Sequence, residues 1–135
     1  MDLDAFVTGC NNLPELKARD QWEAISELLD NMVATGKIKA EHRPAIELAV
    51  KQRETSMSTA IGSGIGLPHA RTDFVTEIVG AYGQSKQGIN FDAPDQGPVH
   101  KVILFLAPKD HTEKLINALA NIPKLLAKLD SEPPG

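Results

Sequence analysis

Residues 99–106, VHKVILFL, contain a run that is hydrophobic on both alternating faces from Val102 onward. Successive strand residues point to opposite faces of a sheet. A run that is apolar on both faces is therefore typical of a central strand covered on both sides. A second strand is predicted over 77–83, EIVGAYG. A sheet built around these strands needs helices to cover it.

Three segments have the apolar spacing of amphipathic helices. Between 19 and 36, apolar residues recur at intervals of three and four, and Gly36 supplies a stop signal. A second helix is predicted over about 42–53, with Pro44 tolerated in its first turn. A third helical region begins near Thr112, and Pro123 must kink it or divide it. These elements predict a single-domain layered α/β sandwich, a mixed β-sheet flanked by helices, over residues 1–130, with a disordered tail at 131–135.

Composition excludes several classes of protein. The chain has 135 residues, of which 41% are hydrophobic and 24% charged, with a formal net charge of -4. This acidic balance lacks the basic stripe of a nucleic-acid binder, and no apolar run approaches the ~20 residues that cross a bilayer. The acidic start MDLDAF does not resemble a secretory signal, and the single Cys10 agrees with a reducing compartment. We therefore expect a cytoplasmic protein without direct membrane insertion.

The glycine-rich stretch 56–68 does not match a nucleotide-binding loop. Gly62, Gly64 and Gly66 are followed by neither the Gly-Lys-Ser/Thr of a phosphate loop nor the spacing of G-x-G-x-x-G. Ser63 does not sit in the G-x-S-x-G pattern of a hydrolase elbow. The stretch 84–87 carries one cation and is predicted to be an exposed turn, and 88–97 is rich in turn-forming residues. We expect residues 56–68 to form a loop or an edge strand.

Four histidines are candidates for chemistry. No two of them have the spacing of a metal-binding pair, and one isolated cysteine adds no ligand set, so no metal or other cofactor is expected. His42 and His100 are expected to be structural, because neither has a cation or a glycine loop beside it in the sequence. His69 and His111 remain as the other candidates.

His69 has a setting that suits nucleophilic chemistry. Pro68 precedes it and Arg71 follows two positions later. An imidazole with an unperturbed pKa of ~6.5 is largely neutral near pH 7 and can attack phosphorus without a separate base. Arg53, with the hydroxyls of Ser58 and Thr59, could stabilise the equatorial oxygens of a transferring phosphoryl group. From these residues alone, a phosphoryl acceptor and an ordinary turn histidine both stay open.

Residues 53–71, RETSMSTAIGSGIGLPHAR, resemble the active-site segment of type 2 EIIA domains of the bacterial sugar phosphotransferase system. The family comprises fructose and mannitol EIIA components and the nitrogen-related EIIA regulator. Its pattern is Arg-Glu, a few small residues, and Thr-x-x-Gly-x-Gly-x-x-x-Pro-His, and every element is present. The resemblance extends to 88–92, GINFD, and to 102–108, VILFLAP.

The resemblance implies an α/β sandwich and a role for particular residues. His69 would accept phosphate from a phosphohistidine carrier protein and pass it to a cysteine of an EIIB component, with Arg53 near the phosphate. No nucleotide or metal would be needed, and nucleic acid is not an implied partner. The nitrogen-related branch implies an alternative, a regulatory module whose protein targets change when His69 is phosphorylated.

One departure from the family pattern concerns a second histidine. The family usually has it in a helix after the Ala-Pro dipeptide, where an ungapped alignment places Leu115. His111 lies one helical turn earlier and is the candidate to take this role from a shifted position. A relative that has lost phosphotransfer is a third hypothesis, which Leu115 favours.

Overall fold

The computed structural model describes residues 10–56, 60–62, 64–91 and 97–131. Short strands and two helices come first, two long strands follow, and two helices come last. In chain order the elements are β1 (Asn11–Leu13), α2 (Gln21–Ala34), η1 (Ala40–His42), α3 (Arg43–Ser56), β2 (Ala60–Gly62), β3 (Ile65–Gly66), β4 (His69–Arg71), β5 (Val79–Ile89), β6 (Val99–Ala107), α4 (Thr112–Ala120) and α5 (Ile122–Ser131).

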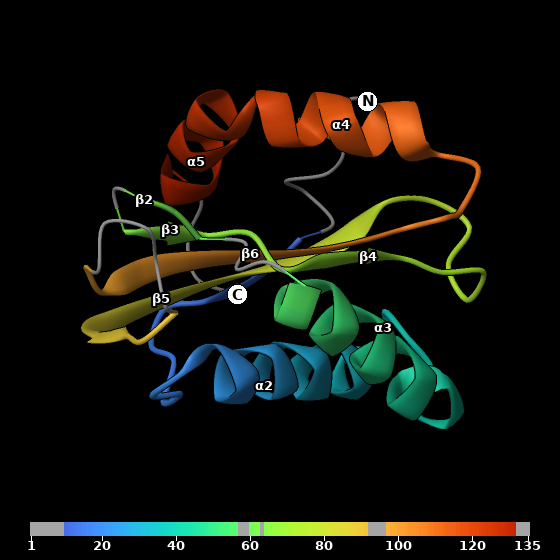
Figure 1. Cartoon of the computed structure of the whole chain (residues 1–135), viewed down its shortest axis with the longest axis horizontal. Coiled ribbons are helices and arrows are strands. Elements are labelled where there is room, and N and C mark those ends of the chain that lie inside the picture. Colours follow the sequence, from blue (N-terminus) through green and yellow to red (C-terminus); the bar gives the residue numbers. More distant parts are fainter. Residues whose placement is uncertain (1–9, 57–59, 63, 92–96, 132–135) are drawn as a thin grey trace.

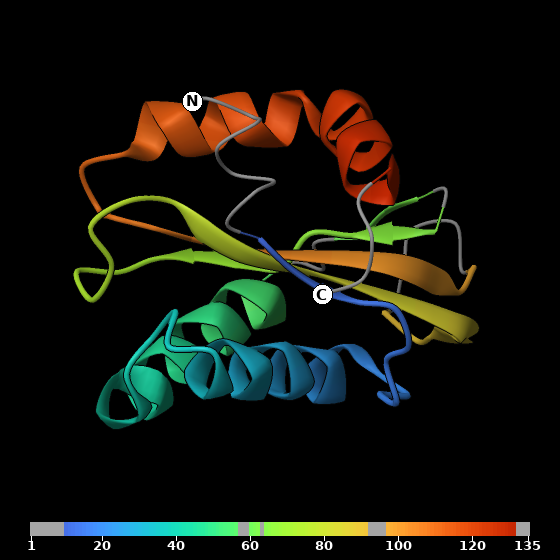
Figure 2. The same cartoon turned by 180° about the vertical axis from the view of Figure 1, so that it is seen from behind.

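Strand β6 is the centre of a mixed sheet with the order β1-β5-β6-β3-β2. It runs antiparallel to β5, and on its other edge it pairs in parallel with β3 and then with β4. Helices α2 and α3 cover one face of the sheet, and α4 and α5 cover the other (Figures 1 and 2). The predicted α/β sandwich and the central position of the apolar strand are confirmed.

The two faces of β6 explain why its sequence is apolar throughout. Val102, Leu104 and Leu106 pack in the core beneath α2 and α3. Ile103 and Phe105 alternate with them and pack in the second core, beneath α4 and α5. All five are fully buried, and each such side chain contributes about 1.5–3 kcal/mol when it leaves water.

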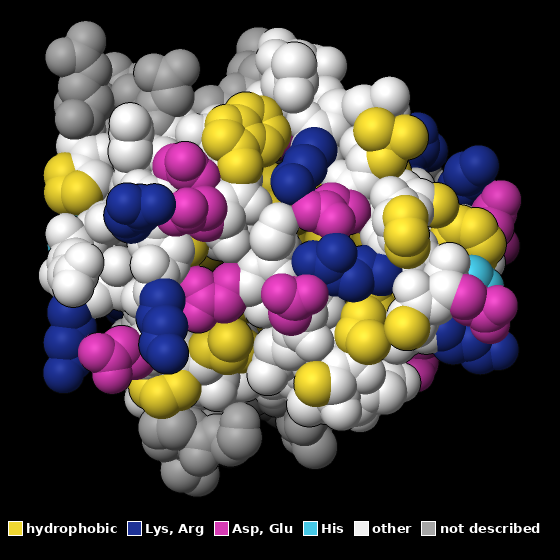
Figure 3. Space-filling model, turned by 90° about the horizontal axis from the view of Figure 1, so that it is seen from below, with side chains coloured by type: hydrophobic (Ala, Val, Ile, Leu, Met, Phe, Trp, Pro, Cys, Tyr) yellow, Lys and Arg dark blue, Asp and Glu magenta, His cyan; other side chains and the backbone are white. Residues whose placement is uncertain are grey.

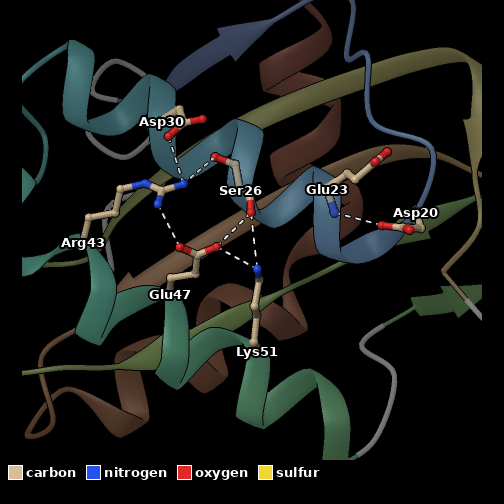
Figure 4. Close-up of polar contacts among 7 residues, drawn as sticks. All are labelled: Asp20, Glu23, Ser26, Asp30, Arg43, Glu47 and Lys51. Atoms are coloured by element: carbon tan, nitrogen blue, oxygen red, sulfur yellow. Dashed lines mark hydrogen bonds and ion pairs between the residues drawn. The ribbon is translucent and has the colours of Figure 1, made fainter.

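A polar network joins α2 to α3 at the surface (Figure 4). Arg43 pairs with Asp30 at 2.9 Å and with Glu47 at 2.8 Å, and Lys51 pairs with Glu47 at 2.7 Å. The hydroxyl of Ser26 donates to Glu47 Oε2 at 2.8 Å. On this face, basic and acidic side chains are interleaved (Figure 3). The network therefore balances charge locally between the two helices.

The helix predictions hold with small shifts at the ends. Helix α2 is capped by Asp20, whose Oδ1 accepts the N–H of Glu23 at 2.9 Å, and Gly36 follows it with a φ of 80°. The last helical region divides as predicted, because α5 starts at Ile122 with Pro123 in its first turn, where no N–H is needed. Helix α5 includes Ser131; residues 132–135 of the expected tail lie outside the described residues.

The prediction of an exposed turn at 84–87 is wrong. Strand β5 continues from Val79 to Ile89, because its backbone pairs with β6 beyond the apolar segment. Gln84 pairs with Lys101 and Ile89 with Val99, and the register shifts between them. Lys86 and Gln87 are exposed, as expected, but they lie on a bulged strand. Backbone hydrogen bonds to β6 hold this segment as a strand, although its polar side chains do not indicate one.

Where the structure describes it, the glycine-rich stretch forms the edge strand β2 and the strand β3, which lies between β2 and β6. Ala60 pairs with Gly66 in the antiparallel β2–β3 ladder, and β3 pairs with β6. A Cβ at Gly66 would meet the ring of Phe91 at 2.8 Å, so glycine allows this close approach. The start of the chain and the segment 92–96 of the predicted turn lie outside the described residues. Among the described helices, none has the length and apolarity of a membrane span.

Candidate functional site

Strand β4 places His69 at the edge of the sheet. His69 pairs with Phe105 of β6, and the carbonyl of Pro68 accepts the N–H of Phe105 at 3.0 Å. The side chain of Ala70 is buried in the core beneath α2 and α3. Because strand residues alternate, His69 and Arg71 share the face opposite to Ala70.

A single hydrogen bond fixes which nitrogen of His69 can react. Its Nδ1 lies 2.8 Å from the carbonyl oxygen of Leu67. A carbonyl can only accept, so Nδ1 carries the proton and donates it. In the neutral ring the lone pair is then on Nε2. The backbone turn before β4 thus leaves Nε2 as the ring nitrogen with a free lone pair.

Burial lowers the pKa of His69 below its ordinary 6.5. The hydrogen bond to the Leu67 carbonyl and the charge of Glu54 act in the opposite direction, whereas the positive charge of Arg53 lowers the pKa further. The neutral form is therefore favoured at neutral pH, and this is the form that has a free lone pair for attack.

His69 opens into a groove of about 640 Å³ between α3 and α4. Helix α3 contributes Arg53 to its wall, strand β4 contributes Arg71, and the connection to α4 contributes Lys109. The described residues that line the groove include these three cations and no carboxylate. Hydroxyl groups of Ser56 and Thr112 also line it. Such a groove attracts an anion to the edge of the sheet beside His69.

The far wall of the groove, on α4, is apolar. It is formed by Leu115, Ile116 and Leu119, of which Leu115 is buried and Ile116 is 58% exposed. Leu115 is the residue that the sequence alignment places at the family's second histidine. This position therefore faces the groove, but it carries no polar atom there.

The structure brings together two of the three predicted site residues. His69 and Arg53 both line the groove. His111 precedes α4 and is not among the lining residues; its Nε2 lies 3.8 Å from a carboxylate oxygen of Asp110. Its Nδ1 is buried and has no hydrogen-bond partner among the described residues. Ser58 and Thr59, the predicted hydroxyl donors, lie outside the described residues.

The other two histidines have packing roles away from the groove. The ring of His42 stacks on Phe74, with centroids 4.2 Å apart. His100 places Nδ1 2.8 Å from the carbonyl oxygen of Ser85, across the β5–β6 pair. Neither lines the groove around His69.

Three residues at or near the groove were not predicted from the sequence. Glu54 is 2% exposed and accepts a hydrogen bond from Gln21 at 3.1 Å, and the charge of this buried carboxylate acts to raise the pKa of His69. Lys109 and Thr112 reach the groove from the far end of β6. The Arg-Glu pair in the motif was a signal for Glu54, whereas only the sheet pairing brings Lys109 and Thr112 to the site.

The fold and the site define a class, an α/β sandwich with a histidine in a cation-lined groove at the sheet edge. Residues 10–131 match the family model described as phosphoenolpyruvate-dependent sugar phosphotransferase system, EIIA 2. The chain belongs to this EIIA type 2 family.

Curated relatives come from both the sugar and the nitrogen branches. The chain is 38% identical over 101 residues to a fructose-specific EIIA component of Haloferax volcanii, covering 72% of this chain and 64% of the relative. It is 30% identical over 118 residues to a nitrogen regulatory protein of Bradyrhizobium diazoefficiens, covering 87% of this chain and 75% of the relative. It matches 18% of the fructose-specific EIIABC component of Bacillus subtilis, at 30% identity over 84% of this chain. The chain thus spans less than two thirds of either fructose-specific relative.

Solved structures show the same fold. The nitrogen regulatory protein IIA-Ntr of Neisseria meningitidis superposes with a TM-score of 0.72 at 22% identity, over 82% of this chain and 74% of that one. The mannitol enzyme IIA of Escherichia coli, in a complex with phosphorylated mannitol enzyme IIB, superposes with a TM-score of 0.66 at 24% identity, over 82% of this chain and 76% of that one.

Proposed function

We propose that Nε2 of His69 accepts a phosphoryl group from a phosphohistidine carrier protein and passes it to a cysteine of an EIIB component. The observation that carries this proposal is the 2.8 Å hydrogen bond from Nδ1 to the Leu67 carbonyl, which leaves Nε2 as the nucleophilic nitrogen. Membership of the EIIA family and the cation-lined groove support it.

Each transfer exchanges one bond to phosphorus for another. In the first step, the P–N bond of the carrier breaks as the lone pair of His69 Nε2 forms a new P–N bond. The imidazole of His69 gains positive charge as this bond forms, and the Leu67 carbonyl stabilises it through the Nδ1–H. In the second step, this P–N bond breaks as a cysteine thiolate of the EIIB component forms a P–S bond.

Arg53 is the residue that we assign to the phosphoryl oxygens. It lies on the last turns of α3 and lines the same groove as His69. Charge on a transferring phosphoryl group is spread over its equatorial oxygens, and a guanidinium stabilises it by charge-assisted hydrogen bonds. The participation of His111 stays a prediction, since it lies outside the lining of the groove.

A regulatory module of the nitrogen-related branch is the alternative function. It is favoured by the nitrogen regulatory relative, which matches more of this chain than the fructose-specific relative of Haloferax volcanii does. In this case phosphorylation of His69 would change the charge of the groove from positive toward neutral, and so alter which protein surface docks on it.

The test is intact-mass analysis after incubation with phosphoenolpyruvate, enzyme I and the carrier protein. We expect one acid-labile phosphate, lost in His69→Ala and retained in His42→Ala, a matched histidine control outside the groove. His111→Ala shows whether that residue assists. Onward transfer to an EIIB cysteine supports transport, whereas partner binding that depends on phosphorylation without transfer supports regulation. If the chain takes up no phosphate from an active donor system, both the transfer function and the regulatory function are wrong. The remaining hypothesis is then a family member that has lost phosphotransfer.

A further inference from the structure

Arg71 enters the groove from the same strand and the same face as His69. Two residues along a strand rise by about 6.6 Å, a distance that an arginine side chain can span. Between them, Ala70 is buried in the opposite direction, beneath α2 and α3. Arg71 is exposed and lines the groove together with His69. The geometry of β4 therefore places Arg71 and His69 on one face of the strand, in the same groove.

Thr112 holds that guanidinium in place. Arg71 Nη1 donates to Thr112 Oγ1 at 2.9 Å, and this hydroxyl lies 3.4 Å from the carbonyl oxygen of Lys109, to which it donates. Thr112 is the first residue of α4, so the bond spans from the sheet edge to the helix above it. A guanidinium has five N–H donors, and only one of those of Arg71 is bonded within the described part of the chain. The remaining donors are available to a ligand.

Arg71 keeps its positive charge uncompensated, unlike Arg43 and Lys101. Arg43 pairs with carboxylates at 2.9 and 2.8 Å, and Lys101 pairs with Asp130 at 2.8 Å. In the groove itself, Lys109 lies 3.4 Å from a carboxylate oxygen of Asp73. Across the described ranges, no acidic side chain lies within ion-pair distance of Arg71, whose partner is a neutral hydroxyl. A pre-positioned cation of this kind suits an anionic ligand.

We infer that Arg71, held by Thr112, is a second phosphoryl-binding guanidinium, which contacts the equatorial oxygens of the phosphoryl group on His69. Arg53 does so from α3, and Arg71 does so from the α4 side of the groove. On that side the wall at Leu115 has no polar group, so Arg71 supplies the positive charge there. This inference rests on the proposed function, because it needs His69 to carry the phosphoryl group.

The experiment uses phosphoramidate, a small donor that needs no protein partner. Its P–N bond breaks as the bond to Nε2 forms, and ammonia leaves with a proton from water. Phosphorylation of the full chain is followed by ³¹P NMR in four proteins: the parent chain, Arg71→Gln, Arg71→Lys and Arg19→Gln. Arg19 is an exposed arginine that is absent from the groove lining, so its substitution is the matched control for loss of one positive charge.

We expect the rate of phosphorylation to fall about tenfold in Arg71→Gln, which corresponds to about 1.4 kcal/mol of lost stabilisation. Arg71→Lys should recover part of it, because an ammonium keeps the charge but not the planar fork. A second readout is the pH titration of the ³¹P shift. A nearby cation favours the dianionic phosphoryl group, so its pKa should rise by about half a unit or more in Arg71→Gln. Arg19→Gln should change neither the rate of phosphorylation nor the pKa of the phosphoryl group.

The outcomes separate this inference from the proposed function. If Arg71→Gln matches Arg19→Gln in both rate and titration, Arg71 does not bind the phosphoryl group, while phosphorylation of His69 stands. If the parent chain takes up no phosphate on His69 either from phosphoramidate or from the phosphorylated carrier protein, both the inference and the proposed function are wrong. Circular dichroism and a melting curve of each variant separate a loss of fold from a loss of phosphate binding.

Discussion

Tyr82 anchors the last helix to the sheet, and Tyr82→Phe removes only the hydroxyl that makes this anchor. The ring is fully buried in the core beneath α4 and α5, and its hydroxyl donates to Asp130 Oδ1 at 2.6 Å. Lys101 Nζ reaches the other oxygen of Asp130 at 2.8 Å. Helix α5 is thereby tied to β5 and β6 through one carboxylate. The helix before it, α4, forms one wall of the groove around His69.

A hydrogen bond to a charged acceptor contributes about 1.5–3 kcal/mol to stability. The side chain of Asp130 is 37% exposed, so water replaces part of the lost bond, and we expect a cost of about 1.5 kcal/mol, at the low end. For 135 residues the entropy of unfolding is about 0.3 kcal/mol/K, which gives a fall in Tm of about 5 °C. The ring of Phe fills the same space, so no cavity term is added.

The stability that Asp130 contributes depends on pH. Burial by itself raises the pKa of Asp130, but the hydrogen bonds from Lys101 and Tyr82 outweigh it and hold the pKa below its ordinary 3.8. Stability from this group is therefore present above pH 3.8 and is lost as the pH falls through the lower folded pKa. Burial and the carboxylate also raise the pKa of Tyr82, so its neutral hydroxyl is kept at least up to pH 10.

Urea unfolding of the parent chain and Tyr82→Phe, at pH 7 and at several pH values below 3.8, measures the stability difference and its pH dependence. The stability difference should be largest at neutral pH and should shrink in acid. The double variant Tyr82→Phe/Asp130→Asn should cost less than the sum of the two single variants. An unchanged stability at pH 7, or strict additivity in this cycle, would refute the coupling between Tyr82 and Asp130.

Three further predictions concern the groove and the elements that build it. Because the pKa of His69 is below 6.5, its rate of phosphorylation by phosphoramidate should fall in acid with a midpoint below pH 6.5; a midpoint at or above 6.5 would contradict this. Gly66→Ala should lose about 1–3 kcal/mol in urea unfolding, because its Cβ would meet the ring of Phe91 at 2.8 Å, and a loss below 0.5 kcal/mol would show that the ring moves freely. Asp20→Ala should lose about 1 kcal/mol through its helix cap, and Asp20→Asn should restore most of it, whereas equal losses would argue against capping.

The sequence predicted the core elements because their patterns depend on local burial. The alternation in β6 and the helical spacing before Gly36 each reflect one element packing on another, so both were visible without the structure. Strand β5 was predicted too short, since its polar half, with a buried Ser85, is held by backbone pairing with β6 rather than by hydrophobic alternation. Pairing between distant segments leaves no periodic signal in either one.

The candidate site was predictable where its residues are close together in the sequence. His69 and Arg53 fall within the motif, and the structure places both in one groove. Arg71 was noticed two positions after His69, but its partner Thr112 is 41 residues away, and only the pairing of β4 with the end of β6 brings it near. His111 was predicted from the helical repeat of α4, yet one turn of helix separates it from the position, Leu115, that faces the groove.

The most direct test of the central claim is to locate the phosphate on the protein. Histidine labelled with ¹⁵N, combined with ³¹P NMR after transfer from the carrier protein, identifies the residue and the ring nitrogen through one-bond coupling. We predict a single phosphate on Nε2 of His69, with Nδ1 still donating to the Leu67 carbonyl. A phosphate on Nδ1, on another residue, or no phosphate at all would contradict it.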